Sequence, residues 1–412
     1  MTTSRTNIEK WILFYDTWGI INTFGAYQTY YETGLLASSS SSDISWIGAV
    51  QAFLLMLVGA ATGPIYDAGY FRELLFSGSF LIVFGQMMLS LCKNYWEAFL
   101  AQAVCIGIGT GLLFVPSVSI LSQYFSTKIS IAVGLAATGS SIGGVIYPIV
   151  FHRLQPTIGF GWATRVIGFI QLATLIIPCV CMKVRVLPGA KRKLVDWAAF
   201  KEMPYTLFTI GGVIGGCPAP LYATTKQKLT TYTGFAGLYV PFFYIQYYAI
   251  TTGITDANLG FYLLAVLNSA SVFGRTIPNF FVGKLGGLNI IAPCALITGL
   301  LIWILLAVYN VGGIIVFCIF YGFFSGTFVS LPPSIFVSLT TNRALIGTRM
   351  GMGFACMSFG VLAGTPIAGA ILGSDNDFSG IWIFGAALTT AGGVLFVLAR
   401  LAKTGPKLIV RA

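Results

Sequence analysis

The chain contains 412 residues, of which 56% are hydrophobic and only 8% are charged. This composition excludes a soluble globular protein, which needs far more polar surface at this length, and predicts an all-α membrane protein. The formal net charge of +11 does not indicate nucleic acid, because the basic residues are scattered over short loops rather than gathered on one face. One histidine and eight cysteines without a CxxC pair favour buried thiols, so we expect no metal and no cofactor.

Apolar segments long enough to cross a bilayer recur along the chain. A hydrocarbon core of about 30 Å needs about 20 apolar residues per helix. Candidate spans lie near residues 11–31, 45–66, 74–92, 98–122, 129–151, 164–182, 234–251, 257–282, 289–308, 312–339, 349–372 and 380–402. They predict twelve transmembrane helices in two six-helix bundles, residues 1–182 and 205–412, joined by a basic cytoplasmic loop at 183–204.

The charged residues predict how these spans are oriented. With the N-terminus in the cytoplasm, the cytoplasmic loops hold most lysines and arginines, and the outer loops keep only Lys93, Arg153 and Arg165. The outer loops also carry the acidic residues Glu32, Asp43, Glu97, Asp256, Asp375 and Asp377. This asymmetry follows the positive-inside rule. We therefore expect a multi-pass protein of the plasma membrane with both termini in the cytoplasm.

One stretch fits the span pattern poorly. Residues 212–233, GVIGGCPAPLYATTKQKLTTYT, place two lysines and two prolines where the seventh span should begin. The flanking segments YTLFTIG and GFAGLYVPFFYIQYYA would join into one helix if this stretch were removed. Two interpretations stay open, a translated intron and a genuine loop.

A repeated motif relates the two halves. GTGLLFVPS at 109–117 and GTFVSLPPS at 326–334 share Gly-Thr and Pro-Ser at identical spacing, and the next span in each half carries Pro148 or Pro366. Internal duplication around a central basic loop is typical of secondary transporters, whose substrate site lies near the membrane midplane between the halves.

At this point the chain resembles the major facilitator superfamily. Gly63, Asp67 and Arg72 in GPIYDAGYFR resemble that superfamily's loop between helices two and three, and Lys284 is the corresponding base in the second half. The resemblance implies that these four residues gate the cytoplasmic face. The usual base directly after the acid is Ala68 here, so turn glycines and topology-setting charges remain the alternative.

Longer segments resemble one branch of this superfamily, the fungal monocarboxylate porters. They include WGIINTFGAYQTYYE at 18–32, GSSIGGVIYPIVFHRLQPTIGFGWATR at 139–165 and GLYVPFFYIQYYA at 237–249. The branch contains relatives of monocarboxylate carriers and vitamin permeases, and many exporters encoded beside secondary-metabolite pathways.

Arg275 lies inside the eighth span, within LNSASVFGRTIPNFF. A charge at the centre of a membrane helix costs about 2.5–3.5 kcal/mol on insertion scales, so it needs a cavity or a partner. In monocarboxylate carriers an arginine of helix eight holds the substrate carboxylate, and the resemblance implies this role for Arg275. A guanidinium suits the role because it can bind both carboxylate oxygens. Snorkelling to the cytoplasmic end, or pairing with Asp67 or a helix C-terminus, is the alternative.

Polar side chains on other inner helices complete the predicted substrate site. Amide and hydroxyl groups among aromatic rings suit a larger, partly apolar solute with a few hydrogen-bond acceptors. The predicted set, besides Arg275, is Asn22, Gln28, Tyr244, Gln246, Asn268 and Ser271. For any one of them, helix packing is the alternative role.

The sequence departs from the carriers at the positions that couple transport to protons. Their aspartate one turn before the arginine is Ser271 here, and their helix-one lysine has no counterpart. Asp16 is the one acidic residue in an early span, and we interpret it as an interfacial residue, with a proton relay as the alternative. Protons therefore stay open as a partner.

These features predict a secondary transporter that moves a small organic acid or a partly apolar metabolite, exporting a secondary metabolite. Monocarboxylate or vitamin uptake, and an inactive or sensor paralogue, are the alternatives. The chain lacks a GxxxxGK[ST] loop and paired catalytic acids, which argues against an ATP-driven pump and an enzyme. The expected partners are an organic anion or metabolite and membrane lipid, without nucleic acid.

The predicted topology can be tested by labelling single introduced cysteines. Lys191→Cys, in the central loop, should react with a membrane-impermeant maleimide only after the cytoplasmic side is opened. Asp375→Cys, between the last two predicted spans, should react in intact cells because that loop faces outward. Reaction of both positions from one side would contradict the layout.

Overall fold

The structure is a computed structural model that describes residues 2–124, 129–182, 194–213, 234–342, 345–373 and 377–405. These residues form helices joined by turns, and no strand occurs among them. Before the central loop lie α1 (Thr2–Asn22), α2 (Phe24–Tyr30), the π-helix η1 (Tyr31–Leu35), α3 (Ser41–Asp67), α4 (Phe71–Leu89), α5 (Tyr95–Ala98), the π-helix η2 (Phe99–Ile106), α6 (Gly107–Tyr124) and α7 (Ile129–Cys181). After it lie the 3-10 helix η3 (Trp197–Lys201), α8 (Met203–Val213), α9 (Gly234–Thr251), α10 (Ala257–Leu285), α11 (Gly287–Leu305), α12 (Val311–Ser330), α13 (Pro332–Leu339), α14 (Ile346–Leu372) and α15 (Phe378–Thr404).

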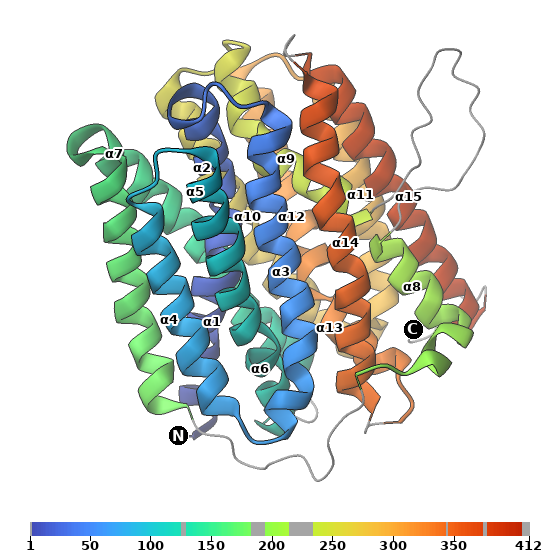
Figure 1. Cartoon of the computed structure of the whole chain (residues 1–412). Helices are drawn as coiled ribbons and strands as arrows, with labels where there is room; N and C mark the ends of the chain where they lie inside the picture. The colour runs from blue at the N-terminus through green and yellow to red at the C-terminus, as the bar shows by residue number, and fades with distance from the viewer. Residues whose placement is uncertain are drawn as a thin grey trace.

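Many of these helices have the length and composition of membrane spans. Within the described residues, nine helical stretches are long and apolar enough to cross a membrane. One of them is α7, whose 53 residues would extend about 80 Å if straight, far more than a bilayer core. Gly159 breaks α7 with φ 77° and ψ 167°, a backbone conformation that favours glycine, so the chain turns back on itself there. The described part is thus that of a multi-pass membrane protein (Figure 1).

α8 and α9 lie on either side of the stretch that fits the span pattern poorly. α8 has 11 residues and α9 has 18, so α8 alone is too short to span and α9 barely long enough. They contact each other, and both pack against α14 and α15. Gly212 and Val213, placed in the doubtful insert by sequence, belong to α8, and the rest of that insert lies outside the described residues. The two flanks therefore lie beside each other and share the same neighbouring helices.

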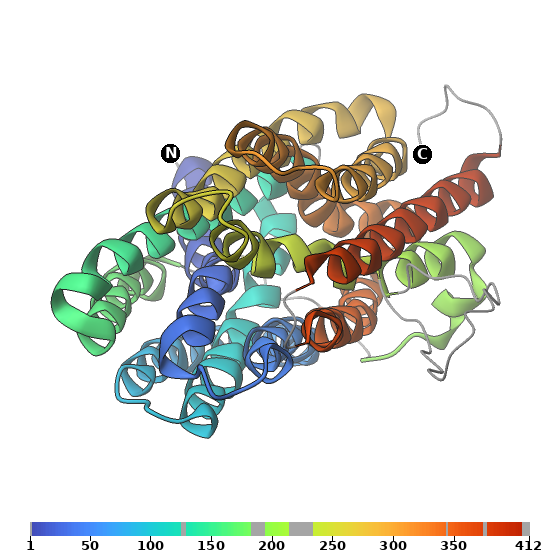
Figure 2. The same ribbon diagram turned by 90° about the horizontal axis from the view of Figure 1, so that it is seen from above.

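The helices gather into two groups. Figure 2 shows the blue-to-green helices α1–α7 on one side of the molecule and the orange-to-red helices, with the light-green α8 beside them, on the other. We call the interface between α1–α7 and α8–α15 the seam. Across it, α3 packs against α14, α7 against α10 and α2 against α9.

Glycines allow backbones to approach closely across the seam. A Cβ atom at Gly134 of α7 would lie 2.6 Å from the carbonyl oxygen of Arg275 on α10. A Cβ atom at Gly25 of α2 would clash with the carbonyl oxygen of Phe242 on α9. Small residues at such contacts are typical of membrane helices, which gain association energy from close packing.

The two ends of the molecule differ in charge. The N-terminus and the α3–α4 turn lie at the lower end in Figure 1, and Arg72 follows that turn. Glu32 in η1, Asp43 at the start of α3 and Glu97 in α5 belong to the opposite end. We call these the basic end and the acidic end. The arrangement agrees with the alternation of loops expected from the sequence.

Two glycines of α10 provide a matched test of helix packing. Gly274→Ala should lower the thermal unfolding midpoint, because its Cβ would clash with the carbonyl oxygen of Phe323. Overpacking of this kind costs about 1–3 kcal/mol. Gly283→Ala should leave the midpoint unchanged or raise it, because no atom lies within 4 Å of its Cβ position. Equal effects of the two substitutions would contradict the α10–α12 packing.

Candidate functional site

Arg275 is buried in the seam. It lies ten residues before the end of α10, about 15 Å from that end, and is 2% exposed. Its Nη1 donates to the hydroxyl of Ser140 at 2.6 Å and to the carbonyl oxygen of Ala137 at 3.3 Å, both on α7. These contacts exclude snorkelling and pairing with Asp67 or a helix C-terminus, the alternatives that the sequence left open.

The Arg275 guanidinium retains unused capacity to bind an anion. Its Nε is buried without a hydrogen-bond partner. Among the residues that the structure describes, no carboxylate lies within ion-pairing distance of it. Burying a cation without a neutralising anion raises the free energy of the folded protein, and binding of an anion lowers it.

A second arginine, Arg349, shows the contrasting case. It lies in the first turn of α14, where its Nε donates to Asp196 at 2.9 Å and its two terminal nitrogens donate to Glu202 at 2.8 and 2.7 Å. This bidentate geometry saturates the guanidinium and ties the end of the central loop to α14. Arg349 is therefore structural, whereas Arg275 keeps its charge available.

Two further polar residues share the face of α10 that carries the arginine. Asn268 and Ser271 precede it by seven and four residues, and both are fully buried. The Ser271 hydroxyl shares a 2.6 Å hydrogen bond with Ser141 of α7. Asn22 on α1 donates to the carbonyl oxygen of Ser140, at 3.4 Å. The structure thus brings together four predicted site residues, Asn22, Asn268, Ser271 and Arg275.

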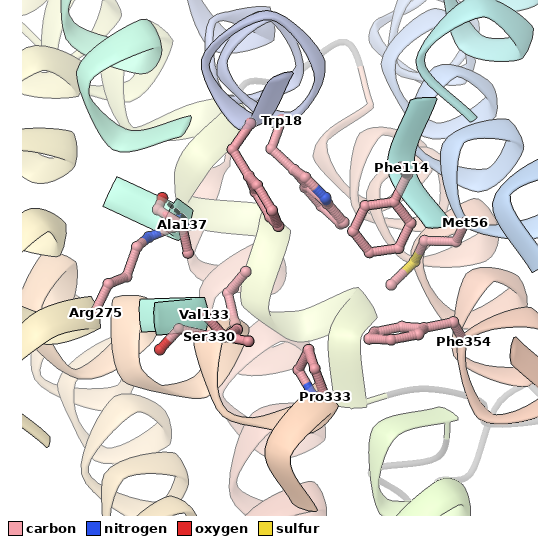
Figure 3. Close-up of a pocket in the computed structure, with 11 residues that line it drawn as sticks. Trp18, Met56, Phe114, Val133, Ala137, Arg275, Ser330, Pro333 and Phe354 are labelled. Atoms are coloured by element: carbon pink, nitrogen blue, oxygen red, sulfur yellow. Dashed lines mark hydrogen bonds between the residues drawn. The ribbon is translucent and has the colours of Figure 1, made fainter. Parts of the chain in front are cut away.

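A small cavity adjoins Arg275 within the seam. Its walls include Trp18, Met56, Phe114, Arg275, Ser330 and Phe354. Figure 3 shows Arg275 on one side of this cavity and the aromatic side chains on the other. The volume is about 20 Å³, and one water molecule needs about 10–15 Å³, so this cavity has room for water but not for an organic solute.

The aromatic wall of the cavity was not anticipated from the sequence. Phe114 packs edge to face with Trp18 and with Phe354, at centroid distances of 5.6 and 5.5 Å. Within apolar spans such residues cannot be told from ordinary core residues. The repeated motif did carry a signal, because Phe114 lies in its first copy and Ser330 in its second.

Gln28 and Tyr244 lie apart from Arg275 and belong to a second polar cluster at the acidic end. Gln28 donates to Glu32 at 2.7 Å and to Ser45 at 3.2 Å, and the Tyr244 hydroxyl shares a hydrogen bond with Ser45 across the seam. We call Gln28, Glu32, Ser45 and Tyr244 the outer network. It bridges the seam at the acidic end, away from Arg275, and the role of Gln28 and Tyr244 in substrate binding stays a prediction.

Gln246 and the predicted gating residues occupy other positions. Gln246 is buried on α9, and neither atom of its amide has a hydrogen-bond partner in the described part of the chain. Gly63 and Asp67 are buried near the end of α3, whereas Arg72 and Lys284 are exposed at the same, basic end. This placement is compatible with gating, which stays a prediction.

Asp16 is not an interfacial residue, contrary to the interpretation from sequence. Its carboxyl group is fully buried between α1 and α7. The Tyr147 hydroxyl donates to it at 2.6 Å, and the Thr174 hydroxyl lies 2.9 and 3.0 Å from its two oxygens. The sequence places Asp16 near the start of a span, which favours an interfacial position. It does not show which face of the helix is covered by other helices.

Comparisons with known proteins agree with this architecture. Residues 11–345 match the family model described as Major Facilitator Superfamily. The MFS-type transporter dbaD of Emericella nidulans is 50% identical over 394 residues, which cover 95% of this chain and 84% of that protein. The aspyridones efflux protein apdF of the same species is 36% identical, covering 92% of this chain and 74% of its own. The agnestins efflux protein AgnL12 of Paecilomyces divaricatus is 35% identical, covering 96% and 86%.

The outer network predicts that one tyrosine hydroxyl helps to close the seam. Tyr244→Phe should increase the rate at which an introduced Asn268→Cys reacts with a membrane-impermeant thiosulfonate, because the seam loses its bond to Ser45. Tyr248→Phe is the matched control, since its hydroxyl donates to Val308 within the second group of helices. Each change costs about 0.5–1.5 kcal/mol, so stability alone would not separate them. Equal labelling rates in the Tyr244→Phe and Tyr248→Phe proteins would contradict the role of Tyr244 in closing the acidic end of the seam.

Proposed function

Because the chain belongs to the Major Facilitator Superfamily, a family of secondary transporters, we propose that it exports a secondary metabolite with an acidic group and an aromatic or apolar body. The observation that carries the proposal is Arg275, a buried guanidinium that no carboxylate neutralises in the described residues. The relatives support export over uptake, since two of them are named as efflux proteins.

The acidic group of the cargo would bind Arg275. Ser140 and Ala137 accept hydrogen bonds from only one terminal nitrogen of the guanidinium, Nη1. The N–H group of Nε has no partner and would donate to a carboxylate or enolate of the cargo. Hydrogen bonds to charged groups are worth about 1.5–3 kcal/mol, and the low dielectric of the closed seam strengthens them. The polar residues Asn22, Asn268 and Ser271 would supply further hydrogen bonds on the same side.

The apolar body of the cargo would contact the aromatic wall. Trp18, Phe114 and Phe354 face the cavity from helices of both groups, and Met56 adds an adaptable thioether side chain. Flat rings stack and pack edge to face with such residues. A lactate-like anion would leave this wall unused, which favours a larger cargo over the monocarboxylate uptake alternative.

Transport would require the two groups of helices to move apart. A cavity of about 20 Å³ holds no organic solute, so the cargo enters and leaves when the seam opens at one end or the other. The outer network would close the acidic end while the basic end is open, and Gly63, Asp67, Arg72 and Lys284 would gate the basic end. This is alternating access around a fixed site.

We also propose twelve spans with cytoplasmic termini in the plasma membrane. α7 would contribute two spans on either side of Gly159, α1 and α2 would form the first span, and α8 with α9 would form the seventh. The basic end would face the cytoplasm, as the positive-inside rule demands.

Arg275→Ala should lower the exchange of labelled aromatic carboxylates in proteoliposomes without ATP. We expect a loss of about 10- to 100-fold, because a charge-assisted interaction of about 1.5–3 kcal/mol is removed. A panel of hydroxybenzoates serves as the probe. Arg165→Ala is the control, because Arg165 does not line the cavity. Its Nε donates to the Ser90 hydroxyl at 3.0 Å. Wild-type exchange in the Arg275→Ala protein would remove this residue from the substrate site.

A further inference from the structure

The segment that joins the central loop to α8 exposes large apolar side chains. It comprises residues 194–203, which include η3 and the first residue of α8, and we call it the η3 segment. Leu194, Trp197 and Met203 are 61%, 75% and 67% exposed. Figures 1 and 2 show this light-green segment at the outer edge of the molecule, below α8 in Figure 1.

The opposite face of the η3 segment is packed against the second group of helices. Ala199 is fully buried, and the Phe200 ring contacts the Tyr205 ring of α8 at a centroid distance of 5.8 Å. Tyr205 in turn contacts Phe336 of α13, at 5.7 Å. The segment is therefore held in place by one face and presents apolar side chains on the other. An exposed apolar face of this kind marks a contact with lipid or with another protein.

The acidic residues of the η3 segment are neutralised, whereas its basic residue is not. Asp196 and Glu202 are the only acidic residues between positions 183 and 204, and both accept hydrogen bonds from Arg349 at 2.7–2.9 Å. Lys201 is exposed and has no ion-pair partner in the described part of the chain. The sequence that precedes the segment is also basic, with Lys183, Arg185, Lys191, Arg192 and Lys193. The exposed side chains of the segment are thus apolar or positively charged.

The η3 segment lies at the basic end of the molecule. Its partner Arg349 is in the first turn of α14. A Cβ atom at Gly369, near the other end of α14, would lie 2.8 Å from the Cα atom of Ser42, which is at the acidic end. The first turn of α14 therefore lies at the basic end, where a spanning helix leaves the hydrocarbon. Tryptophan and basic residues are typical of segments that lie in this boundary layer.

We propose that the outward face of the η3 segment binds the surface of an anionic phospholipid layer. Trp197, Leu194 and Met203 lie among the headgroups and the first acyl carbons, and Lys201 contacts the lipid phosphates. Its positive charge selects anionic over zwitterionic lipid. Charge also favours lipid over a second copy of this chain, because a two-fold contact would bring the same basic face against itself.

Arg349 connects this surface to the seam. It joins the η3 segment to α14, and α14 packs against α3 across the seam, where the Ser42 hydroxyl donates to the carbonyl oxygen of Pro366 at 2.9 Å. Lipid bound to the segment therefore holds the first turn of α14 at a fixed depth in the membrane while the seam opens and closes. This consequence rests on the proposed transport function, whereas lipid binding itself does not.

Quenching of tryptophan fluorescence by brominated lipids tests this surface in the full-length protein. The protein is placed in nanodiscs of phosphatidylcholine and phosphatidylserine in equal amounts, with bromine on the acyl chains of only one of the two lipids. The contribution of Trp197 is the difference between the wild-type protein and Trp197→Phe. We expect this contribution to be quenched, and more strongly when phosphatidylserine carries the bromine.

Two further variants separate charge selection from ordinary contact with lipid. Lys201→Gln should lower the preference of Trp197 for phosphatidylserine about fivefold, the contribution of one basic residue near an anionic surface. Trp96→Phe is the matched control, because Trp96 is 69% exposed at the acidic end between Lys93 and Glu97, whose charges are opposite. The contribution of Trp96 should be quenched equally by the two brominated lipids.

Quenching of Trp197 with a preference for phosphatidylserine that Lys201→Gln reduces supports the proposal. Absence of quenching by either lipid overturns it, because Trp197 then faces water or a protein. Equal quenching by the two lipids, unchanged in Lys201→Gln, overturns it as well, and so does an equal preference at Trp96. The substituted side chains are exposed, so the variants should fold. None of these outcomes alters the expected Arg275-dependent exchange.

Discussion

The Arg275 guanidinium is held at the seam by one hydroxyl and one carbonyl oxygen of α7 rather than by a carboxylate. Burying a cation in this way is tolerable only while its neighbours are polar and an anion can reach it. The hydroxyl of Ser140 and the carbonyl oxygen of Ala137 on α7 supply the polar neighbours, and the cavity beside them is the place where an anion could reach the arginine. Arg349 differs from Arg275 because two carboxylates, Asp196 and Glu202, neutralise its charge, which fits a structural role.

The same constraint explains why the seam must open. Glycines let α7 and α10 touch beside Arg275, and the outer network bridges the seam at the acidic end. Neither the glycine contacts nor the outer network are covalent, and each hydrogen bond contributes only about 0.5–1.5 kcal/mol to the stability of the seam. We propose that this interface closes without cargo and separates when an anion binds the arginine.

Much of the fold followed from hydropathy, because lipid leaves the chain little choice of structure. The split of α7 was visible as two apolar stretches, 129–151 and 164–182, on either side of the Gly159 turn. The flanks of the doubtful insert are predicted to join into one helix without it, and this stays a prediction, although α8 and α9 do contact each other. The family model and the fungal relatives confirm the superfamily, whereas the narrower monocarboxylate-porter branch stays a prediction.

The site was only partly predictable, because residue identity does not fix depth or rotation. Gln28 follows Asn22 by six residues, which places it about 9 Å farther along the helix, in the outer network. The aromatic wall was missed because Trp18 and Phe354 look like core residues in any apolar span. Asp16 was misplaced because its enclosure depends on Tyr147 and Thr174, which are more than 130 residues away in the chain.

The central claim is that the seam alternates between two closures around Arg275. Pulsed electron–electron distance measurements between spin labels test it most directly, with one pair at the basic end (Arg72 and Lys284) and one at the acidic end (Asn94 and Tyr309), all exposed. We expect each pair to show two distances, with the basic-end pair lengthening as the acidic-end pair shortens when an aromatic acid is added. A single unchanging distance for both pairs, with and without the acid, would contradict the account.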